Sequence, residues 1–238
     1  MLKSTRFLLA ALILEFALLV GCSRQEPTPA PQPALDVTPA PPPQSDVGAA
    51  LSADLAARLV REHSPVLGPA NAPVTLVEFL DPACEACAAY APVVRQIEFV
   101  HGQDVRVVVR FAAFHPGSEE AIRLLEAARR QGKFEDTLDA LFVNQEEWAS
   151  HRAPNLARSW EIAQAAGVGL AKARRDAKDA QTDTVLREGA EDVIALQVER
   201  TPTFFINGRP LVNYTPENLM KAVGEEVARA RGTKPTPE

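Results

Sequence analysis

The chain has 238 residues, with 31 acidic and 25 basic side chains, so its formal net charge at neutral pH is −6. This mild acidity argues against a nucleic acid as partner but leaves protein partners open. The sequence also carries no internal repeat, phosphate-binding loop or nucleic-acid-binding motif.

The N-terminal segment, residues 1–21, has the pattern of a secretory signal peptide. Two basic side chains precede an apolar run from residue 7 to residue 20. This run is short for a membrane span, which needs about 20 residues, so a cleaved signal is predicted. Glu15 is an unusual charge inside the apolar run.

The end of this run, Leu19-Val20-Gly21-Cys22, resembles the lipobox of bacterial lipoproteins, in which the cysteine is acylated and becomes the new N-terminus. Cys22 is thus the predicted lipidation site, with an ordinary secretory signal as the alternative. Ser23, by resemblance to the sorting rule of Gram-negative lipoproteins, favours the outer membrane over the inner one. Lipidation of Cys22 would also leave no odd thiol in an oxidising compartment.

Residues 22–50 are predicted to link the lipid to a folded domain over residues 51–238. Eight prolines fall between residues 25 and 44. Such a segment cannot build a hydrophobic core and tends towards the extended polyproline conformation. We therefore expect a disordered tether, with proline-rich recognition by a partner as the alternative.

A strand and the helix start that follows it form the centre of the predicted domain. The apolar run Val74–Leu80 predicts a buried strand, and Cys84 and Cys87 then fall on the first turn of the next helix. A helix N-terminus favours negative charge, and the thiolate is the reactive form of cysteine. Cys84 is therefore the predicted attacking sulfur. Cys87, about one turn later on the same face, is the predicted resolving thiol.

Two other interpretations of the cysteine pair are a structural zinc site and an inert disulfide. A zinc site needs two further ligands, but the third cysteine is Cys22 and the four histidines are scattered without ligand-like pairing. No metal site is therefore predicted. An inert disulfide suits a helix start poorly, because thiols are activated there.

The rest of the domain is predicted to be one more central strand, a long helical region and a terminal hairpin with a helix. Residues 105–114 predict the second central strand, and residues 118–198 predict helices almost throughout. His115, directly after the strand, is interpreted as a surface turn residue, with a position at the active-site end of the sheet as the alternative. Further predictions are helices over residues 51–63 and 171–196, a buried strand at 204–206, a turn at Asn207-Gly208, an edge strand from Pro210, and a last helix capped by Thr215 that runs to about Arg231.

The dithiol segment resembles the active-site segment of the thioredoxin superfamily. Ala91-Pro92 matches the proline that kinks the active-site helix of that family. Residues 201–208, Thr-Pro-Thr-Phe-Phe-Ile-Asn-Gly, resemble its cis-proline loop and the strand that follows. The long separation of the two motifs implies the DsbA-like branch. The resemblance implies an α/β thioredoxin fold, in which helices flank a central mixed sheet and a helical insertion separates the second central strand from the cis-proline strand.

The resemblance also implies roles for individual residues. Glu78, the one charged residue in the first central strand, matches the buried acid that exchanges the proton of the inner cysteine. The alternative for Glu78 is an exposed edge position. Thr201 and Pro202 match the loop that packs beside the dithiol and shapes the substrate groove. Relatives usually have glycine where Gln197 stands, at the entry to this loop.

The two residues between the cysteines, Glu85 and Ala86, are expected to tune the redox potential. Strongly oxidising DsbA proteins have Pro-His there, and the histidine helps to stabilise the thiolate. Glu85 offers no donor and adds negative charge, with Asp81 nearby, so Cys84 should be less acidic and its disulfide less oxidising. The predicted potential lies between those of the strong oxidants and thioredoxin.

With this resemblance, the sequence predicts a lipid-anchored thiol-disulfide oxidoreductase of the periplasm or cell envelope. Its redox group is a Cys84–Cys87 disulfide, and no metal or organic cofactor is expected. The expected partners are proteins with thiols or disulfides and a membrane redox partner, and the protein is expected to be a monomer. Two alternatives stay open: a disulfide reductase or isomerase kept reduced by a membrane donor, and a non-catalytic metal- or protein-binding module.

Overall fold

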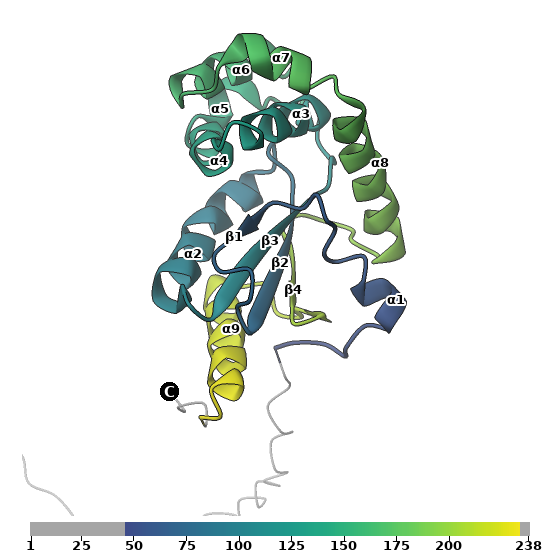
Figure 1. Cartoon of the computed structure of the whole chain (residues 1–238), viewed down its shortest axis with the longest axis vertical. Helices are drawn as coiled ribbons and strands as arrows, with labels where there is room; N and C mark the ends of the chain where they lie inside the picture. The colour runs from purple at the N-terminus through teal and green to yellow at the C-terminus, as the bar shows by residue number, and fades with distance from the viewer. Residues whose placement is uncertain (1–45, 234–238) are drawn as a thin grey trace, which may run out of the picture. The chain divides into compact units, whose positions relative to one another are not determined.

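The computed structural model describes residues 46–233, which lie within one compact unit (Figure 1). The predicted signal peptide, the lipidation site at Cys22 and most of the predicted linker lie outside the described residues. Within residues 46–233, no helix combines the length and the apolar character that a membrane crossing requires.

A mixed sheet lies at the centre of the described fold, with its five strands in the order β1-β3-β2-β4-β5. β2 and β3 run parallel, and the other neighbouring pairs are antiparallel. The central strands β2 and β3 are apolar and almost entirely buried, because both faces of the sheet are covered. The strands are β1 (Val66–Leu67), β2 (Val74–Leu80), β3 (Val105–Phe111), β4 (Thr203–Ile206) and β5 (Arg209–Pro210).

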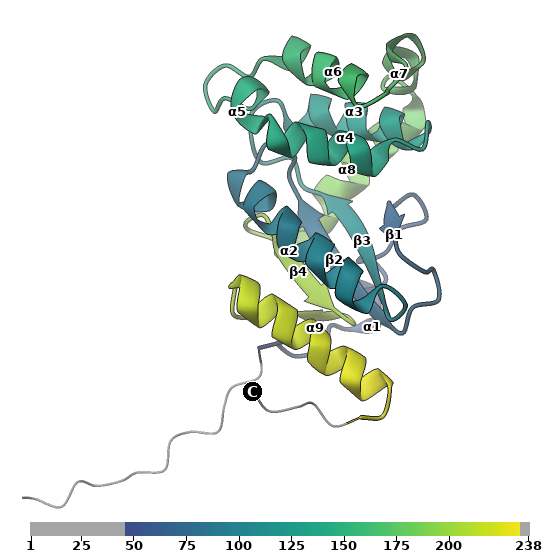
Figure 2. The ribbon, with the colours of Figure 1, turned by 90° about the vertical axis from the view of Figure 1, so that its left-hand side faces the viewer.

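Four helices lie along the faces of this sheet. α2 and α9 pack together on one face, and α8 and the segment around α1 cover the other (Figures 1 and 2). Alternate side chains of β2 therefore enter different cores, with Leu76 on the α2 and α9 side and Phe79 on the α8 side. The four helices are α1 (Ala53–Ala56), α2 (Glu85–His101), α8 (Ala180–Ala195) and α9 (Pro216–Ala230).

The predicted helical insertion between β3 and β4 is confirmed. Its helices before α8 gather at the end of the sheet where β2 and β3 finish (Figure 1). Their apolar sides bury a core that also includes Cys84 and Cys87. The insertion therefore forms one wall of the dithiol region, the surroundings of Cys84 and Cys87. Its helices before α8 are α3 (Ser118–Arg129), α4 (Phe134–Val143), α5 (Gln145–Trp148), α6 (Leu156–Ala165) and α7 (Leu170–Asp176).

Two helices differ from the sequence prediction. The predicted helix over residues 51–63 is only the single turn α1, and the chain then continues in tighter turns. The predicted helix over residues 171–196 is divided into α7 and α8. Asp179 causes this break, because its side chain accepts a hydrogen bond from the Gln181 N–H and so caps a new helix. The last helix begins directly after Thr215, which is its N-cap residue as predicted.

The segment before β4 has an unusual backbone. Gln197 adopts the left-handed conformation, with φ 54°, a region that favours glycine. Glycine would meet the same requirement without strain. The Thr201–Pro202 peptide bond that follows is cis.

Candidate active site

Cys84 and Cys87 lie at the N-terminus of α2, directly beyond β2. Cys84 is the N-cap residue of the helix, Cys87 lies in its first turn, and both are free thiols. The exposed fraction is 6% for Cys84 and 0% for Cys87. Only the outer sulfur is therefore open to attack by another molecule.

The cis-proline loop lies against the outer cysteine. The Cys84 thiol donates a hydrogen bond to the Thr201 carbonyl oxygen, with Sγ and O 3.3 Å apart. Among residues 46–233, the buried Thr201 hydroxyl has no hydrogen-bond partner, yet it lies close enough to Cys84 to favour the thiolate. The fold thus brings together two motifs that are 117 residues apart in the sequence.

The two thiols differ sharply in acidity. A hydrogen bond from the Cys87 thiol is the largest cause that lowers the pKa of Cys84 to about 5, although burial opposes it. The nearby backbone N–H groups of Cys87 and Ala86 act in the same direction. Burial, the contact with Cys84 and the charge of Glu78 raise the pKa of Cys87. At neutral pH one sulfur is therefore ionised and the other protonated.

Glu78 is buried near the dithiol rather than exposed at a sheet edge. It projects from the central strand β2, is 3% exposed, and its Oε1 has no hydrogen-bond partner among the described residues. Burial, followed by the charge of Glu98, raises the pKa of Glu78 to about 8. An adjoining cavity of about 20 Å³ has room for about one water molecule. A carboxyl group in this environment can exchange a proton near neutral pH.

Asp81 joins the dithiol turn to the start of the helical insertion. Its carboxylate is fully buried and accepts hydrogen bonds from the backbone N–H groups of Ala83, Phe114 and His115 at 2.8, 2.7 and 3.0 Å. It also accepts from the Ser118 hydroxyl and lies 2.8 Å from His115 Nδ1. Asp81 therefore lies near the dithiol as expected, and these donors hold its carboxylate in place.

His115 belongs to the dithiol region, which corrects its interpretation as a surface turn residue. Its ring contacts Asp81 and packs edge-on against the His151 ring, with centroids 5.5 Å apart. Burial lowers the pKa of His115, but the Asp81 contact and the charges of Cys84 and Glu85 outweigh it, and the pKa is raised. β3 ends at Phe111, three residues earlier than predicted, and the chain that follows it carries His115 to this region.

Glu85 and Ala86 lie between the cysteines as the sequence dictates, but Glu85 has a partner that the sequence did not indicate. Its carboxylate is 63% exposed and lies 2.7 Å from His151 Nε2. Ala86 contributes its backbone N–H near Cys84. The Glu85 carboxylate therefore interacts with His151 and does not act on the sulfur alone.

Gln145, in α5, is a further residue that sequence reasoning missed. Its side-chain amide donates to the backbone carbonyls of Pro82 and Cys84, at 3.0 and 3.1 Å. The insertion thereby holds the dithiol turn. A single glutamine in a helical segment carries no signal of such a contact, whereas His115-Pro116 directly after a strand does mark the end of the sheet.

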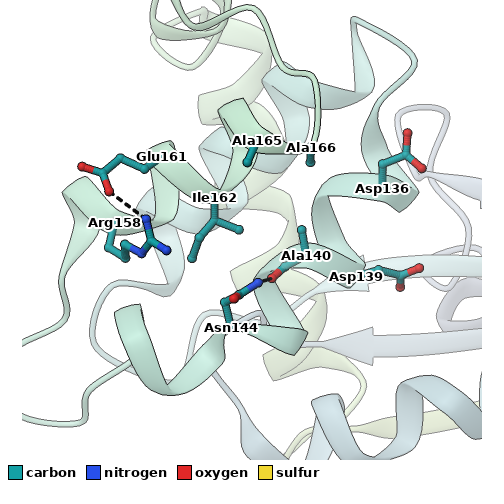
Figure 3. A pocket seen from close by; sticks show the side chains of 9 residues that line it. All are labelled: Asp136, Asp139, Ala140, Asn144, Arg158, Glu161, Ile162, Ala165 and Ala166. Atoms are coloured by element: carbon teal, nitrogen blue, oxygen red, sulfur yellow. Dashed lines mark hydrogen bonds and ion pairs between the residues drawn. The ribbon is translucent and has the colours of Figure 1, made fainter.

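A separate pocket of about 520 Å³ opens between α4 and α6 (Figure 3). Asp136, Asp139 and Glu161 line it together with Arg158, whose Nη1 lies 2.9 Å from Glu161 Oε2. The pocket includes no residue of the dithiol region. Across residues 46–233, no group of three or more His, Cys, Asp or Glu side chains is arranged to hold a metal ion.

Comparison with known proteins places the site in a family context. A thioredoxin family model matches residues 61–225. The Na(+)/H(+) antiporter NhaA of Herminiimonas arsenicoxydans is 33% identical over 175 residues, which is 72% of this chain and 27% of the antiporter. The chain therefore spans about a quarter of the length of the antiporters that it matches.

Solved structures share the fold over nearly their whole length. A thioredoxin-like oxidoreductase from Silicibacter pomeroyi DSS-3 has a TM-score of 0.60 and 24% identity, covering 77% of this chain and 99% of that one. The alpha-DsbA1 of Wolbachia pipientis has a TM-score of 0.65 and 15% identity, covering 73% and 96%. At these identities the similarity is one of fold.

Proposed function

This chain belongs to the thioredoxin family and shares its fold with DsbA-like proteins, and from that premise we propose that it is a thiol-disulfide oxidoreductase acting on protein dithiols and disulfides. The observation that carries the proposal is the asymmetry of the dithiol. Cys84 is an acidic thiol at a helix N-terminus, and Cys87 lies behind it, fully buried and held protonated. One reactive and one resolving sulfur are what disulfide exchange requires.

The exchange would proceed in two steps. The Cys84 thiolate attacks one sulfur of a substrate disulfide, so that a mixed disulfide forms and the other substrate sulfur leaves as a thiolate. Cys87 then loses its proton and attacks Cys84 Sγ, which releases the second substrate thiolate. The substrate gains two electrons and the dithiol becomes a disulfide. Protein oxidation is the same sequence in reverse.

Glu78 is the proposed acceptor of the Cys87 proton, supported by its burial near that sulfur and its pKa of about 8. Thr201 and Pro202 are the proposed wall of the substrate groove, supported by the contact between Cys84 and the Thr201 carbonyl. The unpartnered Thr201 hydroxyl is then free to donate to the thiolate or to a substrate backbone. The reaction draws on the Cys84–Cys87 pair itself as its redox group.

The Glu78→Gln variant is expected to resolve the mixed disulfide about 10²-fold more slowly, because Cys87 then lacks its proton acceptor. The free energy of unfolding of the variant at neutral pH should also exceed that of wild type, by on the order of 1–3 kcal/mol. The folded-state pKa of about 8 lies above the ordinary 4.5. The wild-type fold therefore loses stability as the pH rises from about 4.5 to about 8. Rapid-quench mass spectrometry measures the first effect, and urea unfolding at several pH values the second.

Glu98→Gln is the matched control for this variant. It removes the neighbouring charge that raises the pKa of Glu78 but keeps the Glu78 carboxyl itself. Resolution should then stay within about threefold of wild type. Equal slowing in the two variants would show that Glu78 does not take the proton.

The proposal extends to the cell envelope as location, with a lipid on Cys22 and the outer membrane favoured. Its support is the signal and lipobox pattern of residues 1–22, which lie outside the described structure. A membrane redox partner would recycle the dithiol, and the protein would act as a monomer on proteins with thiols or disulfides.

An equilibrium redox titration against glutathione tests the function. The whole chain is used with Cys22→Ala, which leaves Cys84 and Cys87 as its two thiols. We expect reversible cycling between two and zero free thiols, unaffected by a chelator. The expected potential lies between about −270 mV for thioredoxin and about −120 mV for DsbA. The pKa of Cys84, about 5, supports this, because it lies between about 7 for thioredoxin and about 3.5 for DsbA.

Each outcome of the titration decides between the alternatives. Thiols that react only after a chelator is added would overturn the redox function in favour of a metal-binding module. A value near that of thioredoxin would favour the reductase or isomerase alternative. A value as high as that of DsbA would contradict the tuning argument built on Glu85.

A further inference from the structure

The dithiol region contains a charged group that the exchange mechanism does not use. His115 follows β3, comes from the start of the helical insertion, and is the residue of that loop whose ring contacts Asp81. Its side chain is 25% exposed. The loop is therefore held at the same end of the sheet as Cys84.

Asp81 determines the orientation of the His115 ring. Because Oδ2 of Asp81 is an acceptor 2.8 Å from Nδ1, that nitrogen carries a proton. The backbone N–H of His115 also donates to Oδ2, at 3.0 Å, so ring and backbone are held by one carboxylate. No hydrogen bond engages Nε2 from the described part of the chain, so Nε2 is the nitrogen that titrates.

The surroundings of His115 favour its cationic form. Asp81, the Cys84 sulfur and Glu85 each contribute negative charge towards the ring, and the His151 ring packs against its edge. The carboxylate of Asp81 is already engaged by N–H and O–H donors from Ala83, Phe114 and Ser118 in addition to His115. Because the charge of the Cys84 sulfur favours the cationic ring, the cationic ring favours the Cys84 thiolate in turn.

We propose that His115, held by Asp81, is a positioning residue that stabilises the Cys84 thiolate electrostatically and so makes the disulfide more oxidising. The inference rests on the proposed function and deepens it. The residues between the cysteines provide no cationic side chain, since they are Glu85 and Ala86. His115, in the loop that begins the insertion, supplies a positive charge that the segment from Cys84 to Cys87 lacks. Stabilising the reduced, thiolate form raises the redox potential.

His115→Gln tests this proposal in the whole chain carrying Cys22→Ala. The ultraviolet absorbance of the thiolate and the rate of alkylation, followed against pH, report the acidity of Cys84. We expect the apparent pKa of Cys84 to rise by about one unit, which is about tenfold less thiolate at a pH below both values. Neither readout needs a substrate or turnover, so this result is independent of whether the protein oxidises or reduces proteins.

The pH dependence separates an electrostatic role from a merely structural one. His115 is charged below its pKa, so its effect on the glutathione equilibrium should be present near pH 6 and lost as pH rises through that pKa. We expect wild type to be about fivefold more oxidising than His115→Gln near pH 6 and equal to it at a pH well above the pKa of His115. A difference that persists unchanged at high pH would overturn the proposal.

Two further variants complete the test. His115→Lys keeps a cation at this position and should stay within about threefold of wild type near pH 6, yet remain more oxidising than wild type near pH 9. His101→Gln, at the opposite end of α2, should leave every readout unchanged. Loss of the effect in His115→Lys, or equal effects in His115→Gln and His101→Gln, would exclude charge stabilisation by His115.

Discussion

Replacement of Cys84 by serine is expected to reduce disulfide exchange by more than about a thousandfold, the largest effect of any single substitution on activity. The thiolate is the nucleophile, and a hydroxyl at this position cannot replace it. Cys87 cannot take over, because it is fully buried and its pKa is raised. The measurement is the rate of reduction of a small protein disulfide in the Cys22→Ala background.

Cys87→Ser should behave differently from Cys84→Ser. The outer thiolate still attacks, but the mixed disulfide cannot be resolved, so a covalent adduct with the substrate accumulates. Mass spectrometry without reductant detects this adduct at about one substrate per chain. An adduct on Cys87 in Cys84→Ser, or equal activity of the two variants, would reverse the roles given to the two sulfurs.

Asp192→Ala is expected to destabilise the fold by about 3–5 kcal/mol, because it would leave the buried Arg110 without its counter-charge. Asp192 lies in α8 with its side chain fully buried, 2.7 Å from Arg110 in β3, whose side chain is 2% exposed. Arg58 and Arg61 reach the same carboxylate from the segment after α1, at 2.8 and 2.6 Å. The cluster thus joins the insertion, the sheet and the N-terminal segment.

The same cluster predicts a response to acid. Burial opposes ionisation of Asp192, but hydrogen bonds from Arg61, Arg110 and Arg58 outweigh it and lower the pKa to about 2. Because the folded-state pKa lies below the ordinary 3.8, the stabilisation is present above about pH 4 and is lost as pH falls towards 2. Wild type should therefore lose stability in this window, and Asp192→Ala should not show that loss.

Asp183→Ala is the matched control, because it removes an acidic side chain from the same helix. Asp183 pairs with Arg123 at 2.6 Å, but its side chain is 56% exposed, so the loss should be below about 1 kcal/mol. Urea unfolding near pH 7 measures both variants. Similar losses for the two would mean that burial of the Asp192 cluster contributes nothing specific.

The elements with strong local patterns were predictable. The apolar runs that became β2 and β3, and the cap that starts α9, depend on neighbours in sequence, so periodicity and capping rules located them. The break between α7 and α8 was missed because the helical stripe continues on both sides of it. A single capping aspartate, Asp179, outweighed that stripe.

Some features of the candidate site were likewise predictable from local sequence, and others depend on the whole fold. The order of the cysteines and their place at a helix N-terminus follow from local sequence, and so does the presence of a carboxyl in the strand before them. The burial of Glu78, rather than its exposure at an edge, depends on β2 having β3 and β4 on its two sides. Strand order is a property of the whole fold.

The sequence by itself determined which atoms can carry out the chemistry, because a dithiol at a helix start and a Thr-Pro loop are written as contiguous motifs. Only the tertiary structure decided what surrounds them. His115 lies 34 residues from Asp81, and Gln145 lies 61 residues from Cys84. Such contacts depend on the path of the helical insertion around the end of the sheet. Charge and hydrogen-bond geometry at a site are long-range properties, which local propensity and periodicity do not encode.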